Sequence, residues 1–380
     1  MDKLGIYIHI PFCKKKCKYC DFISFSSSCE NIDRYFKAII NEINDKEISN
    51  LENREISTIY IGGGTPSFVD SKYIINVMNA LKNKFKIKDN AEITIEINPG
   101  TIDSKKLIDY KNIGINRVSI GLQTTNDRLL NLIGRIHNYN DFLNTYKLVK
   151  DIGFENINVD LMLALPTQTK EELIESLNKV IKENPTHISV YSLILEENTE
   201  LEKLILDGTY DLVDEETERR MYWIAKEILE KNGYKHYEIS NFSKVNSESK
   251  HNLDCWNQNE YIGYGLAAHS YLKNKRFSNT SNLEEYIKNI ENNQYIQNVE
   301  VHEEQNGEDA KKEFMMLGLR KIEGVSISEF EKKFRINPLF YFRFEISKLT
   351  DEELIEVDLD NIKLTKKGLD FANKVFEEFV

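Results

Sequence analysis

Three cysteines lie close together near the start of the chain, in the segment HIPFCKKKCKYCDF. Cys13, Cys17 and Cys20 follow a Cys-x3-Cys-x2-Cys spacing, and the whole chain has five cysteines. Three thiolates on one short loop suit a cubane iron–sulfur cluster in which one iron keeps no protein ligand. That open iron can bind a small chelating molecule, and the neighbouring lysines offset the negative charge of the thiolates and the cluster.

Two other interpretations of these cysteines stay open. A structural zinc ion needs four closed ligands, and the fourth would have to be His9, Cys29 or a distant residue. Three unconnected core cysteines are the second alternative. Under the zinc interpretation the chain is a zinc-stapled barrel that only binds partners. Purification without oxygen separates these cases, because an iron–sulfur protein is brown and a zinc protein is colourless.

The composition is that of an ordinary folded protein, with 41% hydrophobic and 11% aromatic residues over 380 positions. The net charge of -12 should repel nucleic acid and anionic membranes, apart from one basic patch formed by Lys14, Lys15, Lys16 and Lys18. No apolar stretch is long enough to span a bilayer, and the N-terminus lacks a signal-peptide pattern. We therefore expect a cytoplasmic protein, in which clustered cysteines indicate metal binding or catalysis rather than disulfides.

Short apolar runs alternate with helical segments over the first two hundred residues. The runs are LGIYIHI, ISTIYIGGG, AEITIEINP, NRVSIGLQ, ENINVDLMLALP and THISVYSLIL. Amphipathic stretches such as 31–43 and 71–85 lie between them. This alternation predicts a parallel sheet covered by helices. Six βα units in series indicate a barrel or most of one, with a doubly wound open sheet as the alternative.

One local pattern recurs where a helix ends and a strand begins. Gly114, Gly153 and Gly233 each follow a helical segment and precede an apolar or aromatic residue. Glycine adopts the left-handed conformation without steric cost, so these three residues are predicted to end their helices.

The second half of the chain is less regular. Residues 214–233 predict a helix, and the next forty residues are rich in aromatic residues, His and Gly. The last eighty residues predict helices around a short β-pair and resemble a winged-helix-like cap. They carry no basic stripe, so packing is a better role for them than DNA reading. We predict a barrel over 1–205, an α+β extension over 206–300 and a C-terminal cap over 301–380.

The cysteine spacing resembles that of the radical S-adenosylmethionine (SAM) superfamily. The resemblance implies a 4Fe-4S cluster on Cys13, Cys17 and Cys20 and a partial (β/α)6 barrel. It also implies that the amino and carboxylate groups of SAM chelate the open iron. In that superfamily one electron from the cluster cleaves the C5′–S bond of SAM and releases a 5′-deoxyadenosyl radical.

Polar residues follow the predicted strands at the ends where barrels bind ligands. Gly62, Gly63 and Gly64 would let the backbone approach a ligand closely, although a glycine turn alone is weak evidence. Glu96 and Asp160 each interrupt an apolar run, so each is expected to be a buried carboxylate that needs a partner. Bound SAM or Arg135 would serve as that partner.

A narrower resemblance rests on YIHIPFCKKKCKYCDF, IGGGTPS, IEINP, SIGLQT, GRIH and NVDLMLALP. These segments are similar to the oxygen-independent coproporphyrinogen III oxidases and the related heme chaperones called HemW, over nearly the whole chain. The resemblance implies a set of residues that line SAM or a second ligand beside it: Tyr7, Tyr19, Gly63, Gly64, Thr65, Glu96, Gln123, Arg135 and Asp160.

Two features separate the oxidases from the chaperones. The oxidases resemble one another in a fourth cysteine two residues after the third, and this chain has Phe22 there. The chaperones carry His-Asn-x-x-Tyr-Trp, and HNLDCW matches it at His251, Asn252 and Trp256. Cys255 stands at the position of the family tyrosine. The resemblance implies that His251 binds heme iron and that Trp256 stacks on the macrocycle, whereas a hydrogen-bonded loop histidine is the simpler interpretation.

The resemblance therefore implies a heme-binding chaperone that delivers heme to acceptor proteins, respiratory ones at the membrane among them. An electron donor such as flavodoxin or ferredoxin is a further implied partner, and nucleic acid is not expected. One alternative is an anaerobic coproporphyrinogen III oxidase, which decarboxylates propionate side chains through the SAM-derived radical. Another is a radical SAM enzyme that acts on heme by methyl transfer or ring opening. His9 and His269 are expected to be structural residues that hold the backbone near the site, and Cys29 is expected to be incidental.

Overall fold

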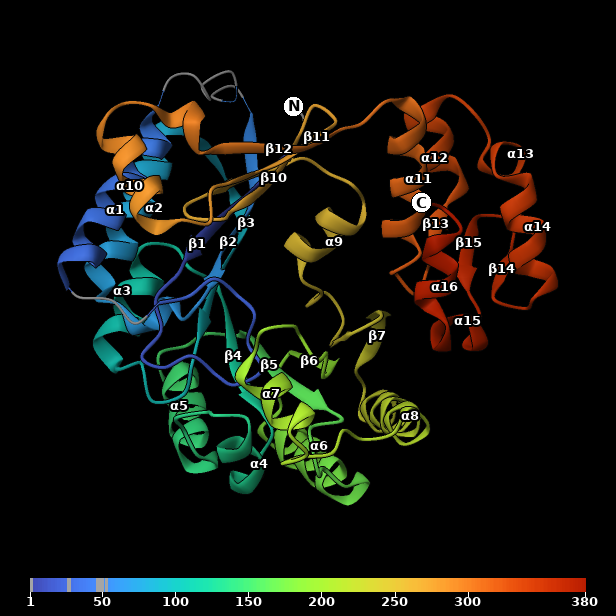
Figure 1. Ribbon diagram of the computed structural model, residues 1–380, viewed down its shortest axis with the longest axis horizontal. Helices are drawn as coiled ribbons and strands as arrows, with labels where there is room; N and C mark the ends of the chain where they lie inside the picture. Colours follow the sequence, from blue (N-terminus) through green and yellow to red (C-terminus); the bar gives the residue numbers. More distant parts are fainter. Residues whose placement is uncertain (1–2, 26–28, 46–50, 52–53) are drawn as a thin grey trace.

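Six parallel strands form the centre of one twelve-stranded sheet in the computed structural model, which describes residues 3–25, 29–45, 51 and 54–380 (Figure 1). They are β1 (Lys3–Ile10), β2 (Glu55–Gly63), β3 (Lys86–Ile97), β4 (Arg117–Gln123), β5 (Asn156–Leu163) and β6 (His187–Ser192). Each of the six apolar runs predicted from the sequence is one of these strands. They lie side by side in chain order, which confirms a partial (β/α)6 barrel.

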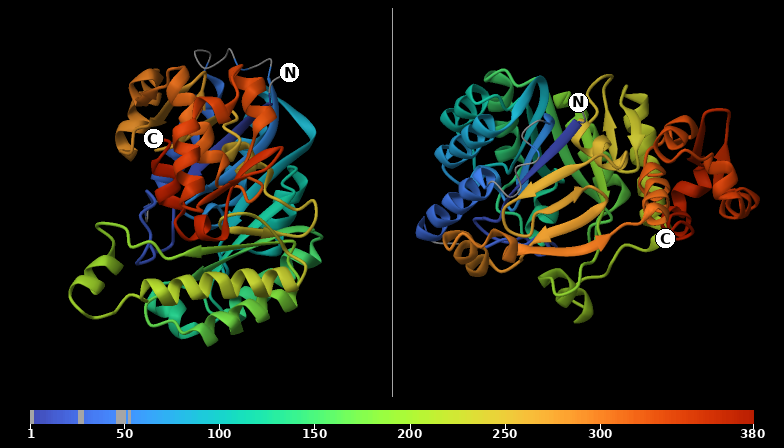
Figure 2. Two further views of the ribbon diagram at one scale, coloured as in Figure 1. Left: turned by 90° about the vertical axis from the view of Figure 1, so that its right-hand side faces the viewer. Right: turned by 90° about the horizontal axis from the view of Figure 1, so that it is seen from above.

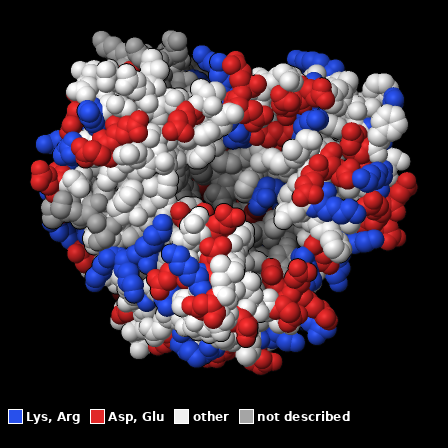
Figure 3. Space-filling view, viewed as in Figure 1, with Lys and Arg blue, Asp and Glu red and all other residues white. Residues whose placement is uncertain are grey.

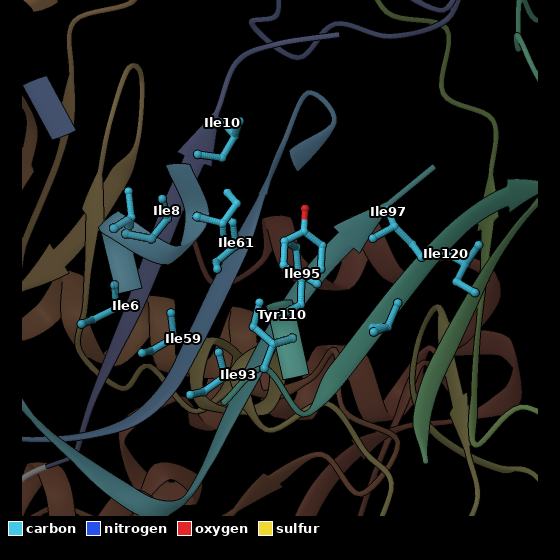
Figure 4. Close-up of a cluster of buried hydrophobic side chains, with 14 of the residues drawn as sticks. Ile6, Ile8, Ile10, Ile59, Ile61, Ile93, Ile95, Ile97, Tyr110 and Ile120 are labelled. Atoms are coloured by element: carbon cyan, nitrogen blue, oxygen red, sulfur yellow. The ribbon is translucent and has the colours of Figure 1, made fainter. Parts of the chain in front are cut away.

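Side chains alternate between the two faces of these strands. Ile6, Ile8 and Ile10 of β1 are buried on the face that carries the isoleucines of β2 and β3 (Figure 4). Tyr7 and His9 point the other way, into the barrel, where the Tyr7 hydroxyl lies 2.9 Å from His9 Nδ1. Because successive strand residues face opposite sides, β1 supplies side chains both to the apolar core and to the polar interior of the barrel.

Helices cover the outer, isoleucine-rich face of the sheet (Figure 2). They are α1 (Cys29–Asn44), α2 (Ser71–Lys84), α3 (Ser104–Asn112), α5 (Tyr139–Asp151), α6 (Lys170–Glu183) and α8 (Glu215–Lys231). The short helix α4 (Asp127–Leu132) packs in a separate, smaller cluster. Gly114, Gly153 and Gly233 have φ values of 96°, 89° and 81°, which confirms their predicted left-handed caps. The Cys29 side chain lies outside the part of the chain that is described.

Residues after β6 extend the sheet at both of its edges. The strands are β7 (Lys235–Glu238), β8 (Asn241–Ser243), β9 (Tyr261–Tyr264), β10 (His269–Leu272), β11 (Lys275–Asn279) and β12 (Val299–Glu304). β8 pairs with β6 at one edge, and β9 pairs in parallel with β1 at the other. Three helices belong to this region: α7 (Glu200–Leu206), α9 (Lys250–Trp256) and α10 (Leu283–Glu291).

The C-terminal residues build a second core of their own, beginning at Phe314. Its elements are α11 (Gly307–Gly318), β13 (Val325–Ser326), α12 (Ile327–Phe334), α13 (Pro338–Tyr341), α14 (Arg343–Asp351), β14 (Ile355–Val357), β15 (Asn361–Leu364), α15 (Lys366–Asp370) and α16 (Ala372–Glu377). The order of helices and strands is winged-helix-like, as predicted. A third short strand, β13, joins the predicted β-pair in a three-stranded sheet.

Polar contacts dock this C-terminal domain on the barrel. The Ile239 backbone N–H donates to the Arg320 carbonyl at 3.0 Å, and the Ile322 N–H donates to the Tyr237 carbonyl at 3.1 Å. Gln258 Nε2, at the end of α9, donates to Glu313 at 2.7 Å. The face viewed in Figure 3 is hollowed between the two parts. No helix in the described part of the chain is long and apolar enough to cross a membrane.

Candidate cofactor site

The cysteine loop follows β1 and is held at the carboxyl edge of the sheet by backbone hydrogen bonds. Within the loop, the Cys13 N–H donates to the Phe25 carbonyl at 3.0 Å, and the Phe25 N–H donates to the Pro11 carbonyl at 2.7 Å. The Gly64 and Thr65 N–H groups donate to the carbonyls of Ile10 and Phe12, each at 2.9 Å. The loop is thus closed on itself and fixed to the glycine loop after β2.

A small apolar cluster supports the middle of the cysteine loop. Tyr19 packs against this cluster, whose buried members include Leu129, Ile133 and Leu201. The Lys18 N–H donates to the Ile133 carbonyl at 3.0 Å, and the Leu201 N–H donates to the Lys18 carbonyl at 2.8 Å. Segments from α4 and α7 therefore position the thiols between them.

A cavity of about 400 Å³ opens beside the loop. It brings together most of the residues that the sequence selected: Cys13, Cys17, Tyr19, Cys20, Gly63, Gly64, Thr65, Glu96, Gln123, Arg135 and Asp160. Its size is within the range of small-molecule sites. Sequence reasoning missed five further polar lining residues: Ser24, Tyr60, Asn98, Ser119 and Tyr191. Tyr60 and Ser119 share the inward alternation of predicted residues on their strands, which is the signal that could have found them.

The glycine loop is shaped by close contacts that exclude a side chain. Gly63 has φ 114°, and a Cβ there would lie 2.6 Å from the His9 ring. A Cβ on Gly64 would lie 3.0 Å from both the Cys13 sulfur and the Ile10 carbonyl. Only glycine therefore lets the β2 loop approach the cysteine loop so closely.

Two carboxylates line the inner part of the cavity. Glu96 accepts from the Tyr60 hydroxyl at 2.8 Å and from the Gly63 N–H at 3.1 Å. Burial raises the pKa of Glu96 to about 7, with Asp160 adding to the rise. Asp160 accepts from Asn158 at 2.7 Å and from Ser119 at 3.2 Å, and burial raises its pKa too.

Two alternative partners were expected for these carboxylates, bound SAM or Arg135, and Arg135 pairs with neither carboxylate. Its guanidinium donates to Asn98 Oδ1 at 2.7 Å, to the Gly121 carbonyl and to Cys17 Sγ at 3.5 Å. The physical reason is position: Arg135 follows α4 and reaches the cavity from the side of the cysteine loop. The Arg135 guanidinium is therefore placed to stabilise the Cys17 thiolate.

The residues present fit an iron–sulfur cluster. Thr65 Oγ1 lies 3.4 Å from Cys13 Sγ, so two of the three sulfurs have hydrogen-bonding neighbours, which stabilise bound thiolates. Burial and the neighbouring Cys17 raise the pKa of the metal-free Cys20 thiol to about 11. No three His, Cys, Asp or Glu side chains in the described ranges are arranged to hold one metal ion. A four-iron cluster does not need such convergence, because each thiolate binds a different iron.

Tyr7 and His9 lie behind the cavity wall instead of lining it. The Tyr7 ring stacks on Tyr60 with 6.3 Å between centroids. His9 Nε2 lies 3.1 Å from the Ile23 carbonyl, so this histidine ties the cysteine loop to β1. His269 is exposed and stacks on His302.

The HNLDCW segment forms α9, at the other end of the barrel. His251 is 8% exposed, and its Nδ1 lies 2.9 Å from Thr58 Oγ1. Burial lowers the pKa of His251 to about 4. Glu92 accepts from the backbone N–H groups of Lys250 and His251, each at 3.1 Å. The structure therefore separates His251 from the cysteine cavity, with the Tyr60 ring 5.3 Å from it and between the two.

Trp256 lies where α9 meets the C-terminal domain. The Arg320 guanidinium lies 4.5 Å from the centre of a Trp256 ring. Both residues neighbour Glu238, whose pKa is raised to about 7 by burial. Burial, with Asp254 next, also raises the pKa of Cys255, to about 12, so this thiol is neutral in the structure as it stands.

Known proteins are similar to the chain over its whole length. The radical SAM superfamily model matches residues 7–180, and the HemN C-terminal domain model matches residues 306–371. "Heme chaperone HemW" of Lactococcus lactis subsp. lactis (strain IL1403) is 36% identical over 374 residues, covering 98% of this chain and 96% of the relative. The protein of the same name from Bacillus subtilis (strain 168) is 36% identical over 375 residues, covering 98% of each.

A solved structure has the same fold. Coproporphyrinogen III oxidase (HemN) from Escherichia coli, described as a radical SAM enzyme, aligns with a TM-score of 0.87 and 23% identity. The alignment covers 100% of this chain and 90% of that one. The fold, the three-cysteine cavity and the full-length similarity lead to one assignment. The chain belongs to the HemW heme chaperone family of the radical SAM superfamily.

Proposed function

We propose that this protein is a heme-binding chaperone that carries a 4Fe-4S cluster and delivers heme to acceptor proteins. The observation that carries the proposal is the chain-length similarity to relatives named heme chaperones. Phe22 supports it over the oxidase alternative, because this residue lines the cavity rim where the oxidases have their fourth cysteine. We place the protein in the cytoplasm, with acceptors there or at the membrane face.

Cys13, Cys17 and Cys20 would hold the cluster, and the cavity beside them would hold SAM. When bound, these groups supply one-electron chemistry. The chain's own residues would orient the cluster and SAM and shield them from solvent. Thr65 and Arg135 neighbour two of the sulfurs, and Gly63 and Gly64 keep the wall close to the loop.

Heme would be bound by α9, with His251 as the iron ligand and Trp256 against the macrocycle. His251 Nδ1 is occupied by Thr58, so Nε2 is the nitrogen left for iron. In the present conformation His251 is buried and Trp256 lies under Arg320. Heme binding therefore requires α9 to exchange some of its protein contacts for heme.

The exposed lysines of the cysteine loop suggest how partners approach. Lys14, Lys15 and Lys16 are exposed, and Lys15 and Lys16 line the cavity mouth. A positive rim on an acidic protein steers anionic partners by long-range attraction. An acidic electron donor such as flavodoxin or ferredoxin fits this requirement.

Heme titration of the anaerobically reconstituted protein tests the proposal. We expect a Soret shift with one heme per chain, and a large loss of affinity in His251→Ala. His269→Ala is the matched control, because that histidine is exposed and lies on β10 instead of α9. An unchanged titration of His251→Ala, or no Soret shift in the native protein, would contradict the proposal.

The oxidase alternative is tested in the same preparation. Incubation with coproporphyrinogen III, SAM and a reductant should give no vinyl product if the protein is a chaperone. Formation of the decarboxylated product would favour the oxidase.

A further inference from the structure

Arg117 is a buried cation without a direct partner in the barrel. It starts β4, faces inward and is 2% exposed. Its guanidinium makes no hydrogen bond or ion pair with any residue that the structure describes, and its Nε is buried. Thr94, the register partner of Arg117 on β3, has a buried hydroxyl that also lacks a partner among the described residues. Two paired positions on the inward face of β3 and β4 therefore carry unsatisfied polar groups.

Leaving these groups unsatisfied is unfavourable, because a buried charge needs a counter-charge or hydrogen bonds. Three inward carboxylates are the obvious candidates, and each is committed elsewhere. Glu96 binds Tyr60 and Gly63, Asp160 binds Asn158 and Ser119, and Glu92 binds the start of α9. None of these three carboxylates forms an ion pair with Arg117. The positive charge of Arg117 still lowers the pKa of Glu96 and of Asp160, against the larger effect of burial.

Arg117 itself lies between the cofactor cavity and α9. Ser119 is two residues further along the same face of β4 and lines the cofactor cavity. On the other side, Glu92, which is two residues before Thr94 on the same face of β3, accepts from the backbone N–H of His251 at 3.1 Å, and His251 is the residue that we propose as the heme ligand. A ligand bound near His251 would thus have a cation within reach.

We propose that Arg117, assisted by the Thr94 hydroxyl, binds a carboxylate of the tetrapyrrole, namely a heme propionate. The guanidinium fork matches a carboxylate with two parallel hydrogen bonds, which adds orientation as well as affinity. This inference rests on the proposed heme-binding function and names the group that would fix the orientation of heme relative to His251.

The experiment compares heme with heme dimethyl ester, which lacks both carboxylates. Each is titrated into the reconstituted native protein, Arg117→Gln and the control Arg128→Gln, whose arginine is exposed and pairs with Glu172. Hydrogen bonds to charged groups predict that the native protein prefers heme by roughly 10-fold or more. Arg117→Gln should lose that preference, whereas Arg128→Gln should keep it. Cluster iron content and thermal midpoint are measured for every variant.

The outcomes separate this inference from the proposed function. If heme binding depends on His251 but Arg117→Gln keeps the full preference for heme, the propionate assignment is overturned and the chaperone proposal stands. If neither residue affects heme binding, both fail. If Arg117→Gln weakens SAM binding and leaves the heme preference intact, the carboxylate belongs to SAM and the inference is overturned.

A test that needs no variant covers the case in which Arg117→Gln does not fold. Equal affinity of the native protein for heme and its dimethyl ester would by itself overturn the inference. Arg117→Lys is the second variant, and we expect it to retain part of the preference, because it keeps the charge and loses the bidentate geometry.

Discussion

The two ends of the barrel differ in whether a ligand can bind without displacing protein contacts. At the carboxyl edge, thiols, carboxylates and glycine backbone surround an open cavity of about 400 Å³. At the opposite end, α9 closes the barrel, and His251 and Trp256 already have protein partners. A small cofactor can enter the first end without rearrangement. Heme at the second end must displace contacts, so its binding is expected to be slower and more sensitive to neighbouring residues.

The largest effect is expected from substitutions at the open end, where the three cysteines lie. Replacing Cys13, Cys17 and Cys20 together by Ser should abolish bound iron in anaerobically reconstituted protein, because the thiolate ligands are removed. Iron analysis and the visible spectrum measure the change. Cys255→Ser should keep its iron, since this cysteine lies on α9. Iron retained by the triple variant would refute the cluster assignment.

The next effect concerns the wall of the cavity. Gly63→Ala should lower the free energy of unfolding by roughly 2–4 kcal/mol, through a strained φ and a clash with His9. Gly208→Ala is the control, because Gly208 also has a positive φ, 76°, but has nothing within 4 Å of an added Cβ. It should cost only about 1 kcal/mol. Chemical denaturation compares the two, and equal losses would contradict the packing argument.

The pH dependence compares the two ends directly. Glu96 at the open end and Glu238 beside Trp256 both have pKa values raised to about 7 by burial, above the ordinary value of 4.5. Their contribution to stability is therefore complete below pH 4.5 and is lost as the pH rises through 7. Between pH 5 and pH 8.5 we expect a loss on the order of 2 kcal/mol for each carboxyl group.

Glu238→Gln isolates the closed end, because it keeps the oxygen that accepts from Ser240 and Asn241 but cannot ionise. Its thermal midpoint should fall less than that of the native protein over this pH range. Glu197→Gln, at an exposed position, should behave like the native protein. An identical pH profile for Glu238→Gln and the native protein would show that this carboxyl does not titrate as stated.

The smallest effect is expected from the contact that holds α9 against the C-terminal domain, namely the Arg320 guanidinium over the Trp256 ring. Arg320→Ala removes the guanidinium over Trp256 and should cost about 1–2 kcal/mol of stability. It should also speed heme association several-fold in stopped-flow measurements, because α9 is released more easily. Arg343→Ala is the control, since Arg343 lies 4.5 Å from the Phe344 ring on the exposed surface. Heme association that is no faster in Arg320→Ala would count against a clamped α9.

Local patterns allowed much of the fold and the open end to be predicted. Apolar runs identified β1 to β6, and Gly114 ended its helix as expected, because both depend on a few neighbouring residues. The cysteine spacing located the cavity for the same reason. The partners of Glu96 and Asp160 were not predictable, since Tyr60 and Ser119 come from neighbouring strands whose proximity depends on sheet register.

The closed end was harder to foresee. HNLDCW identified His251, but its burial depends on Thr58 and Glu92, which are distant in sequence. Arg117 gave no signal, because a single arginine at a strand start is ordinary until the surrounding carboxylates are seen to be occupied. The strands β9 to β12 were also not separated from the mixed region, because each is only four to six residues long.

The position of β1 has a consequence for biosynthesis. β1 pairs with β2 on one side and with β9, residues Tyr261–Tyr264, on the other. The ribosome makes β1 first, yet its second neighbour emerges only after more than two thirds of the chain. Until then β1 is an unpaired sheet edge, and the thiols that follow it lack their finished surroundings. Cluster assembly is therefore expected to follow translation, so a nascent or truncated chain should not be competent for iron loading.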